Sequence, residues 1–179
     1  MTVVVIDTNV LLVANGNHHG VSAACRAACI SKLQARMKSG AVAVDDAFRI
    51  LGEYQNKTRP NQPKGVGDVF LKWLLQNAAN TSRVHRIAIT ETQQDQFEEF
   101  PDPVLQPHFD APDRKFAAVA HAHPAKPPIW QAADSKWLAW WPQLRACGVL
   151  VEFLCPTDAL TFYTAKFPDR PVPDLPAGA

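Results

Sequence analysis

A short apolar segment near the N-terminus constrains the fold of this chain more than any other feature. Residues 2–6 are all β-branched, and the run from position 3 to position 6 is apolar without interruption before Asp7 follows. A segment of this kind suits a central strand of a parallel sheet, which is covered on both faces. Parallel neighbours must be joined by long crossover connections, usually helices. The segment therefore predicts an α/β fold.

Further strand-like and helix-like segments alternate along the chain. Thr90, with Gln93 three residues later, matches a capping box and predicts a helix over residues 90–100. The remaining expected strands are 41–44, 86–89, 129–132 and 149–154, and the remaining expected helices are 22–40, 45–57, 68–77, 113–123 and 136–147. This alternation predicts a three-layer αβα sandwich around a central, mostly parallel five-stranded sheet.

The length of 179 residues suits one domain. We expect residues 1–167 to form it. Residues 168–179 contain four prolines and are expected to be an extended or disordered tail.

The composition excludes several protein classes. With 47% apolar and 20% charged residues, the chain has the make-up of an ordinary globular protein. No apolar run approaches the roughly 20 residues of a membrane span. The apolar N-terminal segment lacks a preceding basic region and is interrupted by Asp7 and Asn9, so we do not expect a signal peptide.

The four cysteines favour a reducing compartment. Cys25 and Cys29 lie one helical turn apart among alanines and are interpreted as small buried hydrophobic residues, while Cys147 and Cys155 flank an expected strand. There is no Cys-x-x-Cys or His-x-x-x-His pair with zinc spacing, so a structural zinc is not expected. We therefore expect a cytoplasmic protein without a membrane segment.

The charge distribution is uneven although the net charge is only +1. From residue 49 to residue 86 seven Lys or Arg residues face two acids, whereas residues 87–110 hold six acids and no Lys or Arg. A basic segment can follow a phosphate backbone, and two solvated helix faces of opposite sign would explain the pattern equally well. The candidate phosphate contacts are Arg49, Arg59, Lys64 and Lys72.

Four carboxylates carry the strongest functional signal. Asp7 and Asp134 follow expected strands, Glu53 lies in an expected helix, and Asp113 opens another. Ligands of an open parallel sheet collect beyond the carboxyl ends of its strands, where such residues converge. Clustered acids without matching cations resist burial unless a cation joins them. Oxygen ligands of this kind suit one or two Mg²⁺ or Mn²⁺ ions, which can activate water against a phosphodiester.

Other catalytic motifs are missing from the sequence. Ser135 follows Asp134, but no Gly-x-Ser-x-Gly elbow surrounds a serine and no histidine stands in a recognisable partner position. The pair Gly65 and Gly67 is too short for a phosphate-binding loop and follows no strand. A metal-dependent phosphodiesterase is the chemistry that remains.

The order of these motifs resembles that of PIN-domain nucleases. The segment around Asp7-Thr8-Asn9 resembles the opening strand of that family, and the segments Arg-Ile-Leu-Gly-Glu53-Tyr, Asp113-Arg-Lys-Phe-Ala-Ala and Ala-Asp134-Ser-Lys-Trp resemble its second, third and fourth motifs. The similarity covers residues 2–155 in the same order. Compared with the compact toxins of the family, this chain has extra segments near 58–82 and 101–112.

The resemblance implies a specific activity. It implies Mg²⁺ or Mn²⁺ at Asp7, Glu53, Asp113 and Asp134, and usually endoribonuclease activity, with DNA as a further candidate substrate. Many members are toxins paired with an antitoxin protein, which makes an antitoxin a candidate partner. A homodimer through the Trp-rich or Ala-rich helices is a further candidate. The supporting residues at the site would be Thr8, Asn9 and Ser135.

Two other functional classes compete with a nuclease. One is a nucleic-acid-binding or assembly module whose PIN-like site is vestigial, against which the presence of all four acids counts. The other is a haloacid-dehalogenase-type phosphatase, which needs a second aspartate where this chain has Asn9.

Several polar residues have a simpler structural interpretation. Asp45 and Asp46 suit helix caps better than metal ligands, and His121 and His123 suit the C-terminal turn of a helix. The residues Trp137, Trp140 and Trp141 are expected to pack in the core or at an interface, with base stacking as the alternative.

Overall fold

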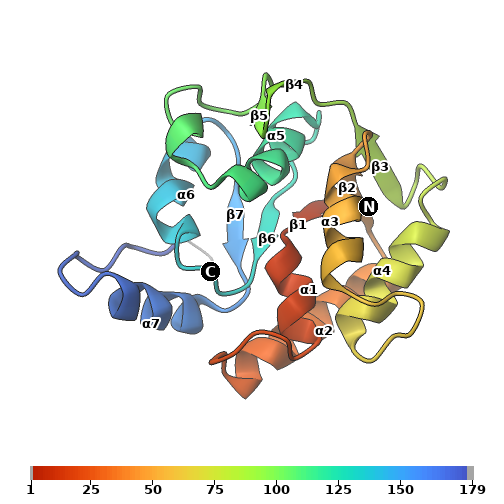
Figure 1. Ribbon diagram of the computed structural model, residues 1–179, viewed down its shortest axis with the longest axis horizontal. Helices are drawn as coiled ribbons and strands as arrows, with labels where there is room; N and C mark the ends of the chain where they lie inside the picture. Colours follow the sequence, from red (N-terminus) through yellow and green to blue (C-terminus); the bar gives the residue numbers. More distant parts are fainter. Residues whose placement is uncertain (1, 177–179) are drawn as a thin grey trace.

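The computed structural model describes residues 2–176, which form a five-stranded, fully parallel sheet flanked by helices (Figure 1). The strands lie in the order β3-β2-β1-β6-β7. Their bounds are β1 Val3–Ile6, β2 Ala41–Asp45, β3 Val84–Ile87, β6 Ile129–Gln131 and β7 Val151–Phe153. The predicted five-stranded αβα sandwich is thereby confirmed.

The helices cover the sheet and one another. The α-helices are α1 Thr8–Ala14, α2 Ala23–Lys38, α3 Arg49–Lys57, α4 Val66–Gln76, α5 Arg114–Ala122, α6 Trp137–Ala146 and α7 Pro156–Lys166. Helix α5 packs on β1 and β2, whereas α1, α2 and α4 pack against one another. At the edge of the sheet formed by β7, α6 contacts β7 and α7 contacts α6. No helix among the described residues is long and apolar enough to cross a membrane.

The middle of the sheet is buried on both faces, as its β-branched sequence predicts. Val4, Val5 and Ile6 of β1 are at most 2% exposed, and all five residues of β2 are buried. Each such aliphatic side chain stabilises the fold by about 1.5–3 kcal/mol relative to an exposed one. Burial of these strands is therefore the main reason that this part of the chain folds.

The strand order reverses direction next to β1. From β1 the chain continues to β2 and β3 on one side, and later returns to add β6 and β7 on the other. In sheets of this type the crevice for ligands lies beyond the carboxyl ends of the strands where the order reverses. Here that point lies after β1 and β6, next to α1, α3 and α5 (Figure 1).

The prediction of a helix over residues 90–100 was wrong. This segment forms an antiparallel hairpin of β4 Glu91–Gln93 and β5 Gln96–Phe97, with a positive φ of 54° at Asp95 in the turn. The segment has no apolar stripe that a helix could bury, and a helix needs one to be stable. Thr90 bonds to Glu99 across the hairpin instead of capping a helix.

Two helices and several boundaries were not predicted. Helix α1 starts directly after Asp7, and α7 starts at Pro156, where the missing N–H of proline is harmless. Strand β3 begins and ends two residues earlier than expected. The extra segment 58–82 supplies α4, and the extra segment 101–112 holds two short 3₁₀ turns, Gln106–His108 and Ala111–Asp113.

Helix α4 lies unusually close to α1 because of a glycine. A Cβ on Gly67 would lie 2.3 Å from the carbonyl oxygen of Leu11, so a larger residue would push the helices apart. The loop before α4 is held by buried Asp68, which accepts N–H groups from Arg59 at 2.8 Å and Lys64 at 2.9 Å. The glycines of this segment thus serve helix packing.

Cys25 was interpreted as a small buried hydrophobic residue with a free thiol, and this interpretation was wrong. Cys25 and Cys155 form a disulfide across 130 residues of sequence, while Cys29 and Cys147 are free. Sequence spacing could not show this pair, because the tertiary fold brings α2 against the start of α7.

The C-terminal segment 168–176 has neither helix nor strand, and it is attached to the rest of the chain. The indole N–H of Trp141 donates to the Asp174 carbonyl at 3.0 Å, and Leu175 packs on the core. The last part of the predicted tail, 177–179, lies outside the described residues.

Candidate metal centre

Asp7 forms the centre of the site at the end of β1. Its N–H donates to the Trp130 carbonyl at 2.9 Å, which joins β1 to β6, and its carboxylate accepts the Asn9 N–H at 2.8 Å as the N-cap of α1. The side chain is 4% exposed. Burial raises the pKa of Asp7 well above its usual range, and the nearby carboxylates of Asp113, Asp134 and Glu53 raise it further.

The two residues after Asp7 connect it to its surroundings. The Thr8 hydroxyl donates to the Glu53 carboxylate of α3. The Asn9 side-chain oxygen accepts the Ala132 N–H at 3.0 Å and so fixes the chain that leaves β6. Of the three supporting residues expected from the sequence, Thr8 contacts Glu53, and the Asn9 side chain contacts the segment after β6 rather than Asp7.

Glu53 is held between two donors. Besides Thr8, the ammonium group of Lys115 on α5 contacts its carboxylate at 2.5 Å. The next residue, Tyr54, is fully buried and donates its hydroxyl to the Ile6 carbonyl, just before Asp7. Burial, followed by the charges of Asp7 and Glu53, raises the pKa of Tyr54, so the hydroxyl remains protonated and anchors α3 to β1.

Asp113 lies at the end of a 3₁₀ turn and precedes α5. Burial raises its pKa to about 7, with further contributions from the charges of Asp134 and Asp110. Lys115 opposes this shift. A carboxyl group with such a pKa exchanges its proton near neutral pH.

Asp134 lies three residues beyond β6. Its carboxylate accepts the Lys136 N–H at 3.1 Å, and its own N–H donates to the Gln131 side chain at 3.4 Å. Its charge raises the pKa of both Asp7 and Asp113, which places all three in one electrostatic environment. The neighbouring Ser135 is buried, and its carbonyl accepts the Leu138 N–H at the start of α6.

Three further residues belong to the site although the sequence did not identify them. Lys115 pairs with Glu53, and Lys136 pairs with Asp110 of the extra segment 101–112. The expectation of acids without matching cations was thus wrong in part. Which acid a lysine side chain contacts depends on how the helices pack. No local sequence signal describes that packing.

The charge of the site remains unbalanced even with these lysines. Asp7, Glu53, Asp110, Asp113 and Asp134 lie together with Lys115 and Lys136, so the acids exceed the lysines by three when all are ionised. A hard divalent cation suits such a set of oxygen ligands.

The carboxylates do not close around one point. Among the described residues, no three Asp, Glu or His side chains bring their ligand atoms within 4.8 Å of one another; three cysteines alone meet that distance. Binding of one ion by three of the acids would therefore require side-chain movement.

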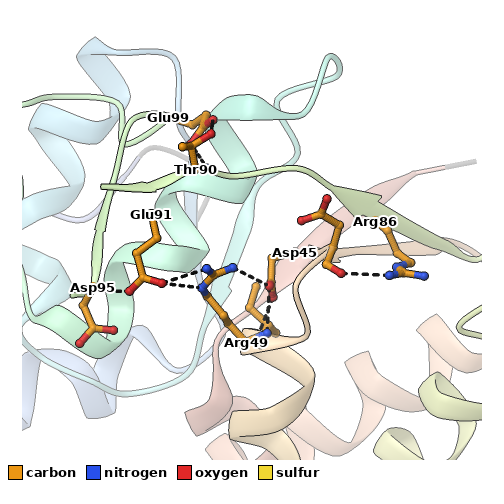
Figure 2. A network of polar contacts seen from close by, with 9 residues as sticks. Asp45, Arg49, Arg86, Thr90, Glu91, Asp95 and Glu99 are labelled. Atoms are coloured by element: carbon orange, nitrogen blue, oxygen red, sulfur yellow. Dashed lines mark hydrogen bonds and ion pairs between the residues drawn. The ribbon is translucent and has the colours of Figure 1, made fainter. Parts of the chain in front are cut away.

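A second polar network lies beside this site at the end of β2 (Figure 2). Asp45 is 1% exposed and accepts the N–H groups of Arg49 at 2.9 Å and Ile50 at 2.7 Å, so it satisfies two donors in the first turn of α3, whose N-cap position is Phe48. The Arg49 guanidinium is 3.7 Å from Asp45 and donates to Glu91 at 2.9 and 3.1 Å. Arg49 is thus committed to two acids and does not offer a free charge to phosphate.

The other candidate phosphate contacts are differently placed. Arg59, Lys64 and Lys72 are exposed, and none of them takes part in an ion pair of the described residues. Arg59 lines a cavity of about 340 Å³ together with polar neighbours such as Gln55 and Asn61. These three side chains remain available to an anionic partner.

The histidines and tryptophans have structural roles. His123 is buried and contacts His85 at 2.9 Å, and His121 contacts the Glu99 carbonyl at 2.9 Å. Trp137 is fully buried and packs edge-on against Phe109, as expected for core packing.

Comparison of the chain with protein-family models, with curated proteins and with solved structures finds no match. The resemblance to PIN-domain nucleases therefore stays an expectation.

Proposed function

We propose that this protein is a metal-dependent endonuclease that hydrolyses phosphodiester bonds, with RNA as its substrate. The observation that supports the proposal is the position of Asp7. It is buried where the strand order reverses, and Glu53, Asp113 and Asp134 are near enough to raise its pKa. The strand ends at such a reversal are where α/β sheets place their ligands.

The residues of the site divide into acidic ligands and polar residues that position them. Asp7, Asp113 and Asp134 would hold one or two Mg²⁺ or Mn²⁺ ions together with Glu53. The ions would supply charge stabilisation at the phosphate and activation of water. Thr8 orients Glu53, and Asn9 keeps the end of β6 in position.

Lys115 supplies a positive charge inside the candidate site. Its ammonium group contacts the Glu53 carboxylate, at 9% side-chain exposure. If the carboxylates held a cation, this ammonium group could instead contact a phosphate oxygen of the substrate. The lysine thus serves as an internal counter-ion that an incoming substrate can share.

The choice of RNA rests on charge and on the resemblance. Exposed, unpaired Arg59, Lys64 and Lys72 can follow a phosphate backbone. The same proposal includes a cytoplasmic enzyme, an antitoxin-like protein partner and a homodimer; DNA is the competing substrate.

A binding or assembly module with a vestigial site is the second candidate. The ion pair between Lys115 and Glu53 favours it, because Lys115 already neutralises one of the four acids. The spacing of the carboxylates also favours it, since no three acids among the described residues bring their ligand atoms within 4.8 Å of one another.

Cleavage of an end-labelled RNA oligonucleotide separates the two functions. We expect cutting in Mn²⁺, loss of cutting in EDTA, and a decrease of about 100-fold or more in Asp7→Asn, which corresponds to roughly 2.7 kcal/mol. Asp46→Asn removes the same charge from an exposed position one residue beyond β2 and should cut normally. RNA binding without cutting in Mn²⁺ would favour the binding module. Cutting of a DNA of matched sequence, without cutting of the RNA, would show that DNA is the substrate.

A further inference from the structure

A second cluster of ligand-type side chains lies outside the carboxylate site. Cys25 and Cys29 are one turn apart on α2, and Cys155 follows β7 at the start of α7. Their sulfur atoms all lie within 4.8 Å of one another, and Cys29 Sγ is 3.9 Å from Cys155 Sγ. All three side chains are buried, with at most 4% exposure.

The cluster can exist in two covalent states. In the structure Cys25 and Cys155 share a disulfide, and Cys29 is a free thiol. A dithiol reductant can transfer two electrons and two protons to the disulfide, which gives two protein thiols while the reductant becomes a disulfide. The reduced protein then holds three thiols at one place.

We propose that the reduced form binds one Zn²⁺ ion through Cys25, Cys29 and Cys155. Tetrahedral zinc with sulfur at about 2.3 Å keeps its sulfur ligands about 3.8 Å apart. The 3.9 Å between Cys29 Sγ and Cys155 Sγ agrees with this spacing, and the Cys25 and Cys155 sulfur atoms separate once the disulfide is reduced. Binding releases the thiol protons to solvent, so it is a coordination step without further redox change. The site differs from the carboxylate site in its soft ligands.

The fourth ligand position has an access route. A cavity of about 140 Å³ is lined by Cys25 and Cys155 and also by Asp158 of α7. Asp158 accepts the Ser22 N–H at 2.6 Å, just before α2. A water in this cavity, or the Asp158 carboxylate, would complete the coordination.

The proposed site links two helices in either state. The disulfide and the zinc ion both use Cys25 of α2 and Cys155 of α7, so they exclude each other. The reduced protein would therefore exchange a covalent connection for a metal connection. The missing Cys-x-x-Cys motif does not argue against this, because residues four apart on a helix also point to one side.

Cobalt binding by the full-length protein tests the proposal. After reduction with dithiothreitol and removal of the reductant without oxygen, Co²⁺ should give thiolate-to-cobalt absorption at one ion per chain, and Zn²⁺ should displace it. The oxidised protein should give at least tenfold less of this absorption.

Two variants test the ligands Cys25 and Cys29, and two further variants are controls. Cys29→Ser, which leaves the disulfide pair intact for folding in the oxidised form, should lose most of the absorption after reduction, and Cys25→Ser should do the same. Cys147→Ser is the matched control outside the cluster and should behave as the wild type, and Asp7→Asn should retain the absorption because carboxylates give no thiolate band. A reduced wild-type protein without the band overturns the proposal. So does a band that survives in folded Cys29→Ser and Cys25→Ser.

Discussion

Asp7 and Asp45 occupy equivalent places on neighbouring parallel strands, yet their carboxylates have different surroundings. Asp45 receives two backbone N–H groups and lies beside Arg49 (Figure 2). Asp7 receives one N–H group and faces Asp113 and other acids. A buried carboxylate with a full set of donors stabilises the fold. A buried carboxylate that faces other acids is suited to an external cation.

The largest effect on stability is expected from Asp45→Ala. The change leaves the buried N–H groups of Arg49 and Ile50 without an acceptor and should lower the free energy of unfolding by about 3 kcal/mol. Urea unfolding in EDTA measures it. The exposed neighbour Asp46→Ala is the control and should change stability by less than about 0.5 kcal/mol. Equal effects of the two variants would remove the distinction between structural and ligand-type acids.

A smaller and metal-dependent effect is expected from Lys115→Met. Loss of the ammonium group leaves Glu53 unpaired, which should cost about 2 kcal/mol in EDTA, and added Mn²⁺ should recover a large part of this loss. Thermal unfolding with and without Mn²⁺ gives both quantities.

The matched variant for this test is Arg49→Met, which breaks an ion pair in the other network. Its stability loss should be the same with and without Mn²⁺. An equal response of both variants to the metal would show that Lys115 is not a counter-ion of a metal site.

The third prediction concerns pH. The folded-state pKa of Asp113 is about 7, above its unfolded value near 3.8, so the folded protein holds the proton more tightly. The stability from this group is complete below the unfolded pKa and is lost as pH rises through the folded pKa. Between pH 5 and pH 7 in EDTA we expect a loss of up to about 1.4 kcal/mol per pH unit relative to Asp113→Asn.

The difference between wild type and Asp113→Asn removes the contribution of His123, because His123 titrates in both proteins, and it reports Asp113 together with its effect on Asp7. Burial lowers the pKa of His123, so its contribution to stability rises with pH and opposes that of Asp113. Parallel stability curves for the two proteins would show that Asp113 does not titrate in this range.

The smallest effect is expected at the exposed basic residues. Arg59→Gln and Lys72→Gln should each lower RNA affinity by less than about 1 kcal/mol and reduce the slope of log affinity against log salt by about one. Lys38→Gln, at the end of α2 beside the amino ends of the strands, is the control and should leave the slope unchanged. Fluorescence anisotropy with labelled RNA in EDTA measures all three.

The sequence predicted the sheet better than its surroundings. Continuous β-branched runs identify buried parallel strands, and β1 and β2 lie within one residue of their expected positions. The hairpin at 91–97 was missed because a capping pattern at Thr90 was interpreted without an apolar face to support it. Local signals fail where packing decides the structure.

The sequence indicated the acidic residues of the candidate site but not the lysines that lie beside them. Asp7 and Asp134 follow strands, so their convergence is a consequence of topology that the sequence can indicate. Lys115 and the disulfide between Cys25 and Cys155 depend on which helices touch, across 62 and 130 residues of sequence respectively. Such contacts cannot be derived from spacing along one chain.

The order of the strands also matters for folding. Val3 of β1 pairs with Ala41 of β2, 38 residues later, whereas Val5 of β1 pairs with Ile129 of β6, 124 residues later. Closing the longer loop costs more chain entropy, so the half of the sheet with β2 and β3 can pair before β6 and β7 are added. Asp7 and Asp134 come near each other only with that second step.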